Sequence, residues 1–298
     1  MGAEDRMNIA GILQTLYDLL PKISFQDILQ TLINSLPMMG RYALVTMGIV
    51  MIFRTTATTN FAQGLIGTFG TFFVTFLSLT FTSLPLWACL LAGILVGFLL
   101  GMFVDVVLIR SARRITPSGK QMITMGVMMI LVNVTPVIFK DITLWTRPGK
   151  AFSNGILHFQ IFGMDMNITE MGLMAFVIAV IVLAAVFAAL KYTKWGLGVR
   201  ATAANETVAQ MLGVNTRVIT AFSWALAGGL ATLGGFGSFP APILGAVIIP
   251  LVYNFAGNPA LMGPNAGMWQ NMITFVVVLL LILAFPNGLL GKKYIKKV

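Results

Sequence analysis

The sequence predicts an all-α polytopic membrane protein with about eight transmembrane helices. Of its 298 residues, 58% are hydrophobic and only 9% are charged, and the mean hydropathy is +0.91. Soluble globular domains carry about 25% charged residues. Apolar runs of about 20 residues, the length that crosses a bilayer as a helix, recur along the whole chain. Once these runs are subtracted, no soluble domain remains.

The formal net charge is +10, and the basic residues gather in a few loops and in the C-terminal tail. This distribution is typical of a protein that obeys the positive-inside rule. Anionic lipid headgroups are the expected partner of such a tail, and we expect no nucleic acid. The basic residues concerned are Arg110, Arg113, Arg114 and Lys120, then Lys191, Lys194 and Arg200, and finally Lys292, Lys293, Lys296 and Lys297.

The N-terminal segment alternates Ile, Leu and Tyr with Asn, Gln and Asp over residues 8–36. This pattern predicts an amphipathic segment along the membrane surface, and we assign residues 1–35 to it. The first residues are charged and lack a compact apolar core, which is unlike a cleaved signal peptide. Residues 36–291 then form the transmembrane domain, and residues 292–298 form a basic cytoplasmic tail.

Three spans are expected in the first half of that domain, over residues 36–53, 61–80 and 85–109. The second span has glycines three residues apart and the third has glycines four residues apart. Small residues at such spacing allow close approach of another helix, so we interpret both rows as packing faces without a ligand role. The glycines are Gly64, Gly67 and Gly70, followed by Gly93, Gly97 and Gly101.

Two more spans, over residues 121–139 and 171–190, enclose the longest mixed polar stretch of the chain. That stretch, residues 140–170, alternates polar and apolar residues near its end, which predicts an outer β-hairpin with its turn near Gly163 to Met166. Counting these spans places the N-terminus outside. Loops 54–60, 110–120 and 191–217 are then cytoplasmic.

The polar segment between Gly196 and Asn215 follows the fifth span. Residues Ala201 to Leu212 can form a short helix, with Glu206 near its middle and Gly213 placed as a C-terminal stop. A short helix on the cytoplasmic face is a natural docking surface for another protein. An ordinary polar linker between two spans is the alternative interpretation of the same residues.

The last part of the chain has three apolar candidates, at residues 218–233, 243–255 and 273–285. The segment before them and the Lys-rich tail after them are both expected in the cytoplasm, which requires an even number of crossings. Three candidates break that parity. Either one late pass is re-entrant, or a pass is missing from the chain.

Candidate chemistry inside the membrane is sparse. Asp105, near the cytoplasmic end of the third span, is the only acidic residue within a span. An ion pair with one of the neighbouring arginines is favoured over a proton relay. His158 is the only histidine, so we expect neither a metal site nor a His-based acid–base relay. The chain also lacks the GxxxxGK[ST] phosphate loop.

Four short motifs, in order along the chain, resemble those of one family. The first is Asn60-Phe61-Ala62-Gln63-Gly64, and the second combines Gly198, Arg200 and Ala201 with Leu212-Gly213-Val214-Asn215-Thr216. The others are Gly235-Phe236-Gly237-Ser238-Phe239-Pro240 and Phe285-Pro286-Asn287-Gly288-Leu289-Leu290-Gly291. Together they resemble the LivH-type permeases, the membrane subunits of bacterial ATP-binding-cassette importers for branched-chain amino acids. The resemblance runs from about residue 30 to the C-terminus.

The resemblance implies a multi-pass permease of the bacterial plasma (inner) membrane that imports branched-chain or related amino acids and is not itself an enzyme. The implied partners are a second permease subunit, two ATPase subunits and an extracytoplasmic substrate-binding protein. ATP would bind to the ATPase subunits, and this chain would bind no cofactor. Segment 196–215 would be the coupling segment that contacts the ATPase, through Arg200, Ala201, Asn205, Glu206, Gly213, Val214 and Asn215.

The resemblance also marks Asn60, Gln63 and Gly64 as candidates for the translocation pathway. Hydrogen bonding between helices is the alternative role for these residues. Compared with the family pattern, Gln63 replaces a His, and this chain is about 30 residues shorter between Ala231 and Gly237. An ion- or proton-coupled carrier and a membrane scaffold without transport remain as alternative functions.

Overall fold

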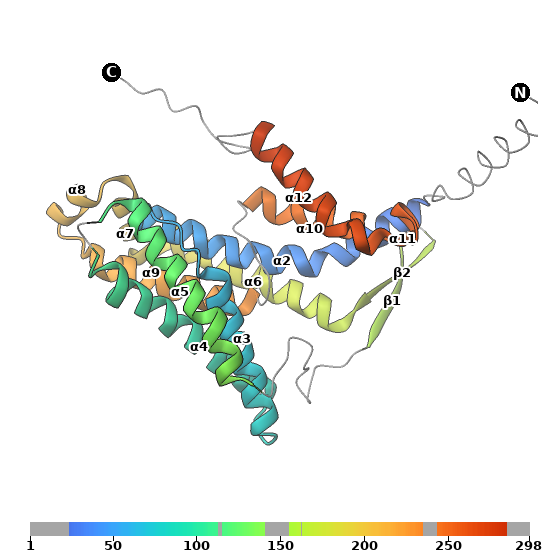
Figure 1. Ribbon diagram of the computed structural model, residues 1–298, viewed down its shortest axis with the longest axis horizontal. Helices are drawn as coiled ribbons and strands as arrows, with labels where there is room; N and C mark the ends of the chain where they lie inside the picture. The colour runs from blue at the N-terminus through green and yellow to red at the C-terminus, as the bar shows by residue number, and fades with distance from the viewer. Residues whose placement is uncertain (1–23, 113–114, 141–154, 162, 235–242, 285–298) are drawn as a thin grey trace, which may run out of the picture. The chain divides into compact units, whose positions relative to one another are not determined.

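A computed structural model describes residues 24–112, 115–140, 155–161, 163–234 and 243–284 of the chain. Nearly all of these residues are helical (Figure 1). The chain divides into two compact units. The bundle unit consists of residues 39–155 and 170–246, and the hairpin unit consists of residues 1–38, 156–169 and 247–298.

The elements follow one another in an order that matches the sequence expectation. They are α2 (Phe25–Thr56), α3 (Gln63–Thr80), α4 (Leu86–Phe103), the π-helical turn η1 (Val104–Ile109), α5 (Pro117–Ile138), β1 (Ile156–Ile161), β2 (Met164–Thr169), α6 (Glu170–Tyr192), α7 (Lys194–Ala204), α8 (Glu206–Met211), α9 (Thr216–Gly234), α10 (Ile243–Gly257), α11 (Pro259–Met262) and α12 (Ala266–Ala284).

Six described helices are long and apolar enough to cross a membrane: α2, α3, α4 with η1, α5, α6 and α12. The two other expected late spans correspond to α9, which has 19 residues, and to the shorter α10, which has 15. The all-α polytopic class is therefore confirmed. Residues 235–242, where the sequence suggests a shortening, lie outside the described residues.

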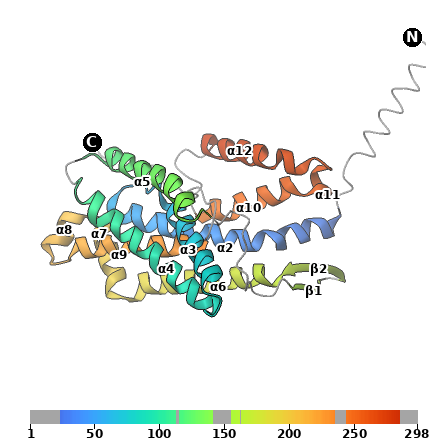
Figure 2. The same ribbon diagram turned by 60° about the horizontal axis from the view of Figure 1, so that its bottom comes forward.

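The bundle unit is built around α9, which packs against α3 and α4 (Figure 1 and Figure 2). The glycine rows of α3 and α4 make this possible. A Cβ atom at Gly97 or Gly228 would collide with the backbone of the facing helix, and one at Gly101 would meet the carbonyl oxygen of Trp224. Backbone contact of this kind needs residues without side chains. The prediction that the glycine rows are packing faces is confirmed.

Two apolar clusters surround α9 in the bundle unit. Trp224 is completely buried in the first, against Ile52 of α2, Ile66 of α3 and Val104 of η1. The second joins Met47 and neighbouring residues of α2 with α6 and with Leu230 of α9. Because α9 faces other helices on most sides, it can carry Thr, Ser and Gly and still lie within the membrane. This explains why its composition is less apolar than that of the outer helices.

The hairpin unit contains the only β-structure among the described residues. Strands β1 and β2 pair antiparallel, and Ile161 faces Met164 where the two strands meet at the turn. Gly163 has φ +75°, a conformation that glycine adopts without strain. The predicted hairpin is confirmed, but its turn lies earlier than Gly163 to Met166, because Met164 and Met166 belong to β2.

Helix α2 extends further toward the N-terminus than the expected first span. It begins at Phe25 and runs without interruption to Thr56, so residues 25–35 are continuous with the span that follows. Two glutamines explain the extension, because Gln26 Nε2 donates to the Asp165 carbonyl oxygen (3.0 Å) and Gln30 Nε2 to that of Asn167 (2.7 Å). The helix is therefore not interrupted at residue 36, where the transmembrane domain is expected to begin. Residues 1–23 lie outside the described residues.

Candidate coupling segment and cytoplasmic cavity

A cavity of about 620 Å³ lies at one end of the bundle unit. It is bounded by the end of α2, the residues around η1, the first turns of α5, and α8 with the start of α9. The structure therefore brings together the three loops that the sequence assigns to the cytoplasm. The lining residues are Thr55, Thr56, Asp105, Ile109, Arg110, Lys120, Glu206, Gln210, Val214, Asn215, Thr216, Arg217 and Thr220.

The expected single helix from Ala201 to Leu212 is wrong, because the segment forms two helices that meet at Asn205. Asn205 is extended (φ −162°, ψ 112°), and its backbone N–H still donates to the Ala201 carbonyl oxygen at the end of α7. Its side-chain oxygen accepts from the Val208 N–H (3.1 Å) and caps α8. Asparagine is among the best N-cap residues, because its side chain satisfies an N–H that lacks a helical partner.

The predicted stop at Gly213 is confirmed. Gly213 has φ +84°, and its N–H donates to the Gln210 carbonyl oxygen (3.0 Å). The N–H of Val214 donates to the Ala209 carbonyl oxygen (2.9 Å). These two bonds form a Schellman motif, the arrangement for which a left-handed glycine after a helix is suited. Helix α8 is thus defined at both ends by local sequence.

Only some of the proposed coupling residues lie at the cavity. Glu206, Val214 and Asn215 line it, whereas Arg200, Ala201, Asn205 and Gly213 do not. The carboxylate of Glu206 accepts from Gln210 Nε2 (3.3 Å) and from Thr216 Oγ1 (3.4 Å). The side-chain oxygen of Asn215 accepts from the Val218 N–H (3.3 Å) and caps α9. Arg200 is exposed on α7. Their contact with an ATPase stays a prediction.

An exposed apolar face on α8 was missed by the sequence reasoning, which concentrated on polar residues. Val208 is 48% exposed, and Met211 and Leu212 are 80% and 78% exposed. Their spacing of i, i+3 and i+4 places them on one side of a helix. That spacing, inside a segment otherwise rich in polar residues, was the signal available in the sequence. Large apolar side chains exposed together often mark a protein–protein contact.

Asn60 and Gln63 of the first motif form buried hydrogen bonds. Each is 2% exposed. Asn60 Nδ2 donates to Gln63 Oε1 (3.1 Å), and Gln63 Nε2 donates to the Ala227 carbonyl oxygen of α9 (2.7 Å). Of the two roles that the sequence left open, this geometry matches hydrogen bonding between helices. Gly64 is half-buried on the same turn. A contribution of these residues to the translocation pathway stays a prediction.

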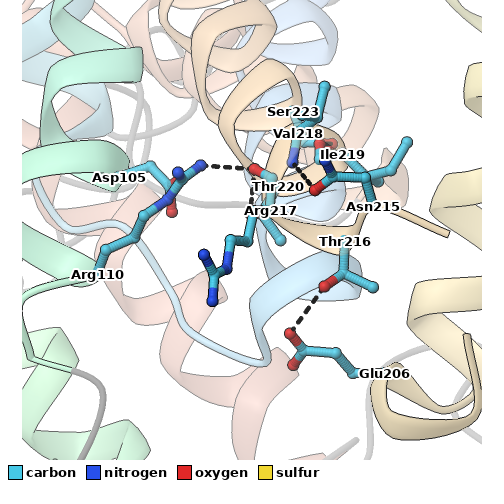
Figure 3. A network of polar contacts seen from close by, with 10 residues as sticks. All are labelled: Asp105, Arg110, Glu206, Asn215, Thr216, Arg217, Val218, Ile219, Thr220 and Ser223. Carbon is cyan, nitrogen blue, oxygen red and sulfur yellow. Dashed lines mark hydrogen bonds and ion pairs between the residues drawn. The ribbon is translucent and has the colours of Figure 1, made fainter. Parts of the chain in front are cut away.

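The expected ion pair of Asp105 is present, and its partner is Arg110 (Figure 3). Arg110 donates to Asp105 Oδ2 from Nη2 (3.1 Å) and from Nε (3.3 Å). Arg110 also donates to the backbone carbonyl oxygen of Arg217 at the start of α9. The pairing spans the π-helical turn η1, for which the sequence offered no signal. Arg113 and Arg114 lie outside the described residues.

Comparison with known proteins places the chain in one family. The family model for the branched-chain amino acid transport system permease component matches residues 31–236. LivH of Escherichia coli K12, a high-affinity branched-chain amino acid transport system permease protein, is 24% identical over 324 positions, which cover 92% of this chain and 99% of that protein. BraD of Pseudomonas aeruginosa, described in the same words, is 23% identical and covers 91% of this chain and 98% of its own. No solved structure matches.

The alignment with the Escherichia coli protein is longer than this chain, so that relative has stretches without a counterpart here. The match nevertheless extends over almost the whole of both proteins. The family-model match over residues 31–236 includes α8 and every residue that lines the cavity. The chain is therefore a member of the branched-chain amino acid transport permease family, a multi-pass inner-membrane protein that serves as a permease subunit of an ATP-driven importer with other subunits.

Proposed function

We propose that this chain imports branched-chain or related amino acids, and that α8 is the surface on which an ATPase subunit docks. The relatives named above are branched-chain amino acid permeases, which supports the substrate class. The observation that carries the docking proposal is the apolar face formed by Val208, Met211 and Leu212. Capped at both ends, α8 presents this face without further ordering, which lowers the entropic cost of binding.

The proposed assembly contains a second permease subunit, two ATPase subunits and an extracytoplasmic substrate-binding protein. ATP binds to the ATPase subunits, and this chain binds no cofactor. When the ATPase subunits close on ATP, they displace α8. The displacement shifts the permease from an outward-open to an inward-open population, because the closed ATPase binds the second state more tightly. Arg200, which is exposed on α7, and Glu206, the first residue of α8, supply polar contacts to the same partner.

Co-purification of ATPase subunits with this chain from membranes tests the docking proposal. We expect Met211→Ser to weaken capture by about tenfold to a hundredfold, because an exposed Met that becomes buried on binding contributes roughly 1.5–3 kcal/mol. The replacement of both Arg200 and Glu206 by Ala should weaken it further. Met122 of α5 is 71% exposed, so Met122→Ser is the matched control and should leave capture unchanged. Unchanged capture by Met211→Ser would contradict the docking surface.

A further inference from the structure

Two polar contacts meet at neighbouring residues at the start of α9, one between Glu206 of α8 and Thr216 and one between Arg110 and Arg217 (Figure 3). Gln210 Nε2 donates to Thr216 Oγ1 (2.8 Å), and Thr216 Oγ1 donates to Glu206 Oε1 (3.4 Å). Thr216 is the first residue of α9. The carbonyl oxygen of the next residue, Arg217, accepts from Arg110, which also holds Asp105. Arg110 therefore joins the start of α9 to the turn η1 that ends the third span.

The π-helical winding of η1 allows Arg110 to make both contacts. In an α-helix, residues five positions apart lie about 140° apart around the axis. In η1, the Arg110 N–H donates to the Asp105 carbonyl oxygen (3.0 Å), so the two residues lie one above the other. Rewinding this turn into an α-helix would separate Arg110 from Asp105 or from Arg217. The contacts of Arg110 with Asp105 and Arg217 therefore stabilise the π-helical winding of this turn.

The helices that Arg110 joins are already in close contact deeper in the bundle unit. Gly97 and Gly101 of α4 lie against Gly228 and Trp224 of α9 at backbone distance. Packed helices of this kind deform little, because any sliding would force backbone atoms together. A displacement of the start of α9 is therefore passed to α4 through this packing, and Arg110 adds a polar connection between the cytoplasmic ends of the two helices.

We propose that Arg110 is a positioning residue that transmits movement of α8 to α4 and α9, so that its loss uncouples ATP hydrolysis from transport. The inference rests on the proposed docking of an ATPase at α8. Arginine suits this role because its planar guanidinium carries several donors in a fixed arrangement and can serve two acceptors at once. A lysine at the same position keeps the charge beside Asp105, but its side chain is one atom shorter than that of arginine, so the ammonium group no longer reaches the Arg217 carbonyl oxygen.

The test uses the complete importer in proteoliposomes, with leucine uptake and ATP hydrolysis measured on the same sample. Arg110→Lys should lower the leucine transported per ATP on the order of tenfold, the effect expected from one charge-assisted hydrogen bond. Hydrolysis itself should stay within about twofold of wild type, since α8 is unchanged. Arg54→Lys is the matched control, because Arg54 is exposed at the end of α2 and does not line the cavity. It should leave the ratio unchanged.

A double-mutant cycle separates transmission from a structural effect. Thr216→Val removes the hydroxyl that links α8 to α9 while keeping the shape of the side chain. If Thr216 and Arg110 transmit the same movement, their losses should not add. The double variant should then transport as much leucine per ATP as the single variant that transports less. The proposal would be overturned if the fold losses of the two single variants multiplied in the double variant. It would also be overturned if Arg110→Lys transported as much leucine per ATP as the wild type.

Two further outcomes are also decisive. If transport, hydrolysis and complex yield fall in parallel in Arg110→Lys, the residue has a structural role only and the proposal is wrong. If the wild-type complex itself neither hydrolyses ATP nor takes up leucine, the proposed function fails instead. That failure is independent of any variant, so it is distinguishable from a failure of the transmission role.

Discussion

At the residue scale, buried polar side chains in this protein join helices. Gln63 is the clearest example, because both ends of its amide are used: Oε1 accepts from Asn60 and Nε2 donates to the Ala227 carbonyl oxygen. Asp105 and Arg110 act in the same way at the cytoplasmic end of the bundle unit. A buried polar group that loses its partner costs about 1–3 kcal/mol, so each of these side chains constrains its neighbours.

Replacement of Gln63 by Leu should therefore lower the stability of the protein. We expect a loss of about 1–3 kcal/mol, because the Asn60 amide loses its acceptor in an apolar environment and the bond between α3 and α9 is removed. Thermal unfolding of the detergent-solubilised protein, followed by its tryptophan fluorescence, measures this loss. If leucine transport falls while stability stays at the wild-type value, Gln63 acts on the translocation pathway and not in helix packing.

At the element scale, α8 depends on local signals at both ends. Asn205 caps its start, and the left-handed Gly213 ends it. A helix of six residues is too short to be stable by its own hydrogen bonds. The caps and the bonds of Glu206 and Gln210 to Thr216 compensate for this. The apolar face of α8 consequently keeps one orientation relative to α9.

Gly213→Ala tests this dependence. A Cβ at Gly213 meets nothing within 4 Å, so its only cost is the positive φ, about 1 kcal/mol for a residue other than glycine. We expect several-fold weaker capture of ATPase subunits, because α8 is then less often fully formed. Gly126→Ala is the matched control, since Gly126 of α5 has equally open space and an ordinary helical conformation. Equal capture by both variants would contradict the dependence.

At the scale of the whole molecule, the bundle unit brings four segments of the chain to one end. The end of α2, the turn η1, the start of α5 and segment 196–215 all line one cavity. The positive-inside rule assigns this end to the cytoplasm. The hairpin of residues 156–169 follows the fourth span and is therefore expected on the opposite side of the membrane.

Cysteine labelling checks this topology directly. Cys89, the single native cysteine, is completely buried, so the wild-type chain should remain unlabelled by a membrane-impermeant maleimide. Leu212→Cys should react only in inside-out vesicles, because Leu212 is 78% exposed at the cytoplasmic end. His158→Cys, on the exposed strand β1, should react only in right-side-out vesicles. Labelling of both variants from the same side would contradict the assigned topology.

The sequence by itself determined the class of the protein, the positions of the spans and the family. Hydrophobic runs, charge distribution and glycine spacing are local properties of the sequence. In a bilayer, an apolar run of sufficient length forms a spanning helix, and the basic residues in the loops set its orientation. The hairpin near Gly163 and the stop at Gly213 were also readable, because a turn and a helix cap depend on neighbouring residues.

Only the tertiary structure decided which polar residues meet. Asn205 divides the coupling segment because its side chain competes with the helix, and the pattern of apolar residues does not report such competition. Gln63 reaches a residue 164 positions away, and Arg110 reaches one 107 positions away. The spacing of apolar residues in the sequence does not reveal the π-helical turn that positions Arg110. Contacts between distant segments depend on how whole helices pack, and packing is a property of the assembled bundle unit.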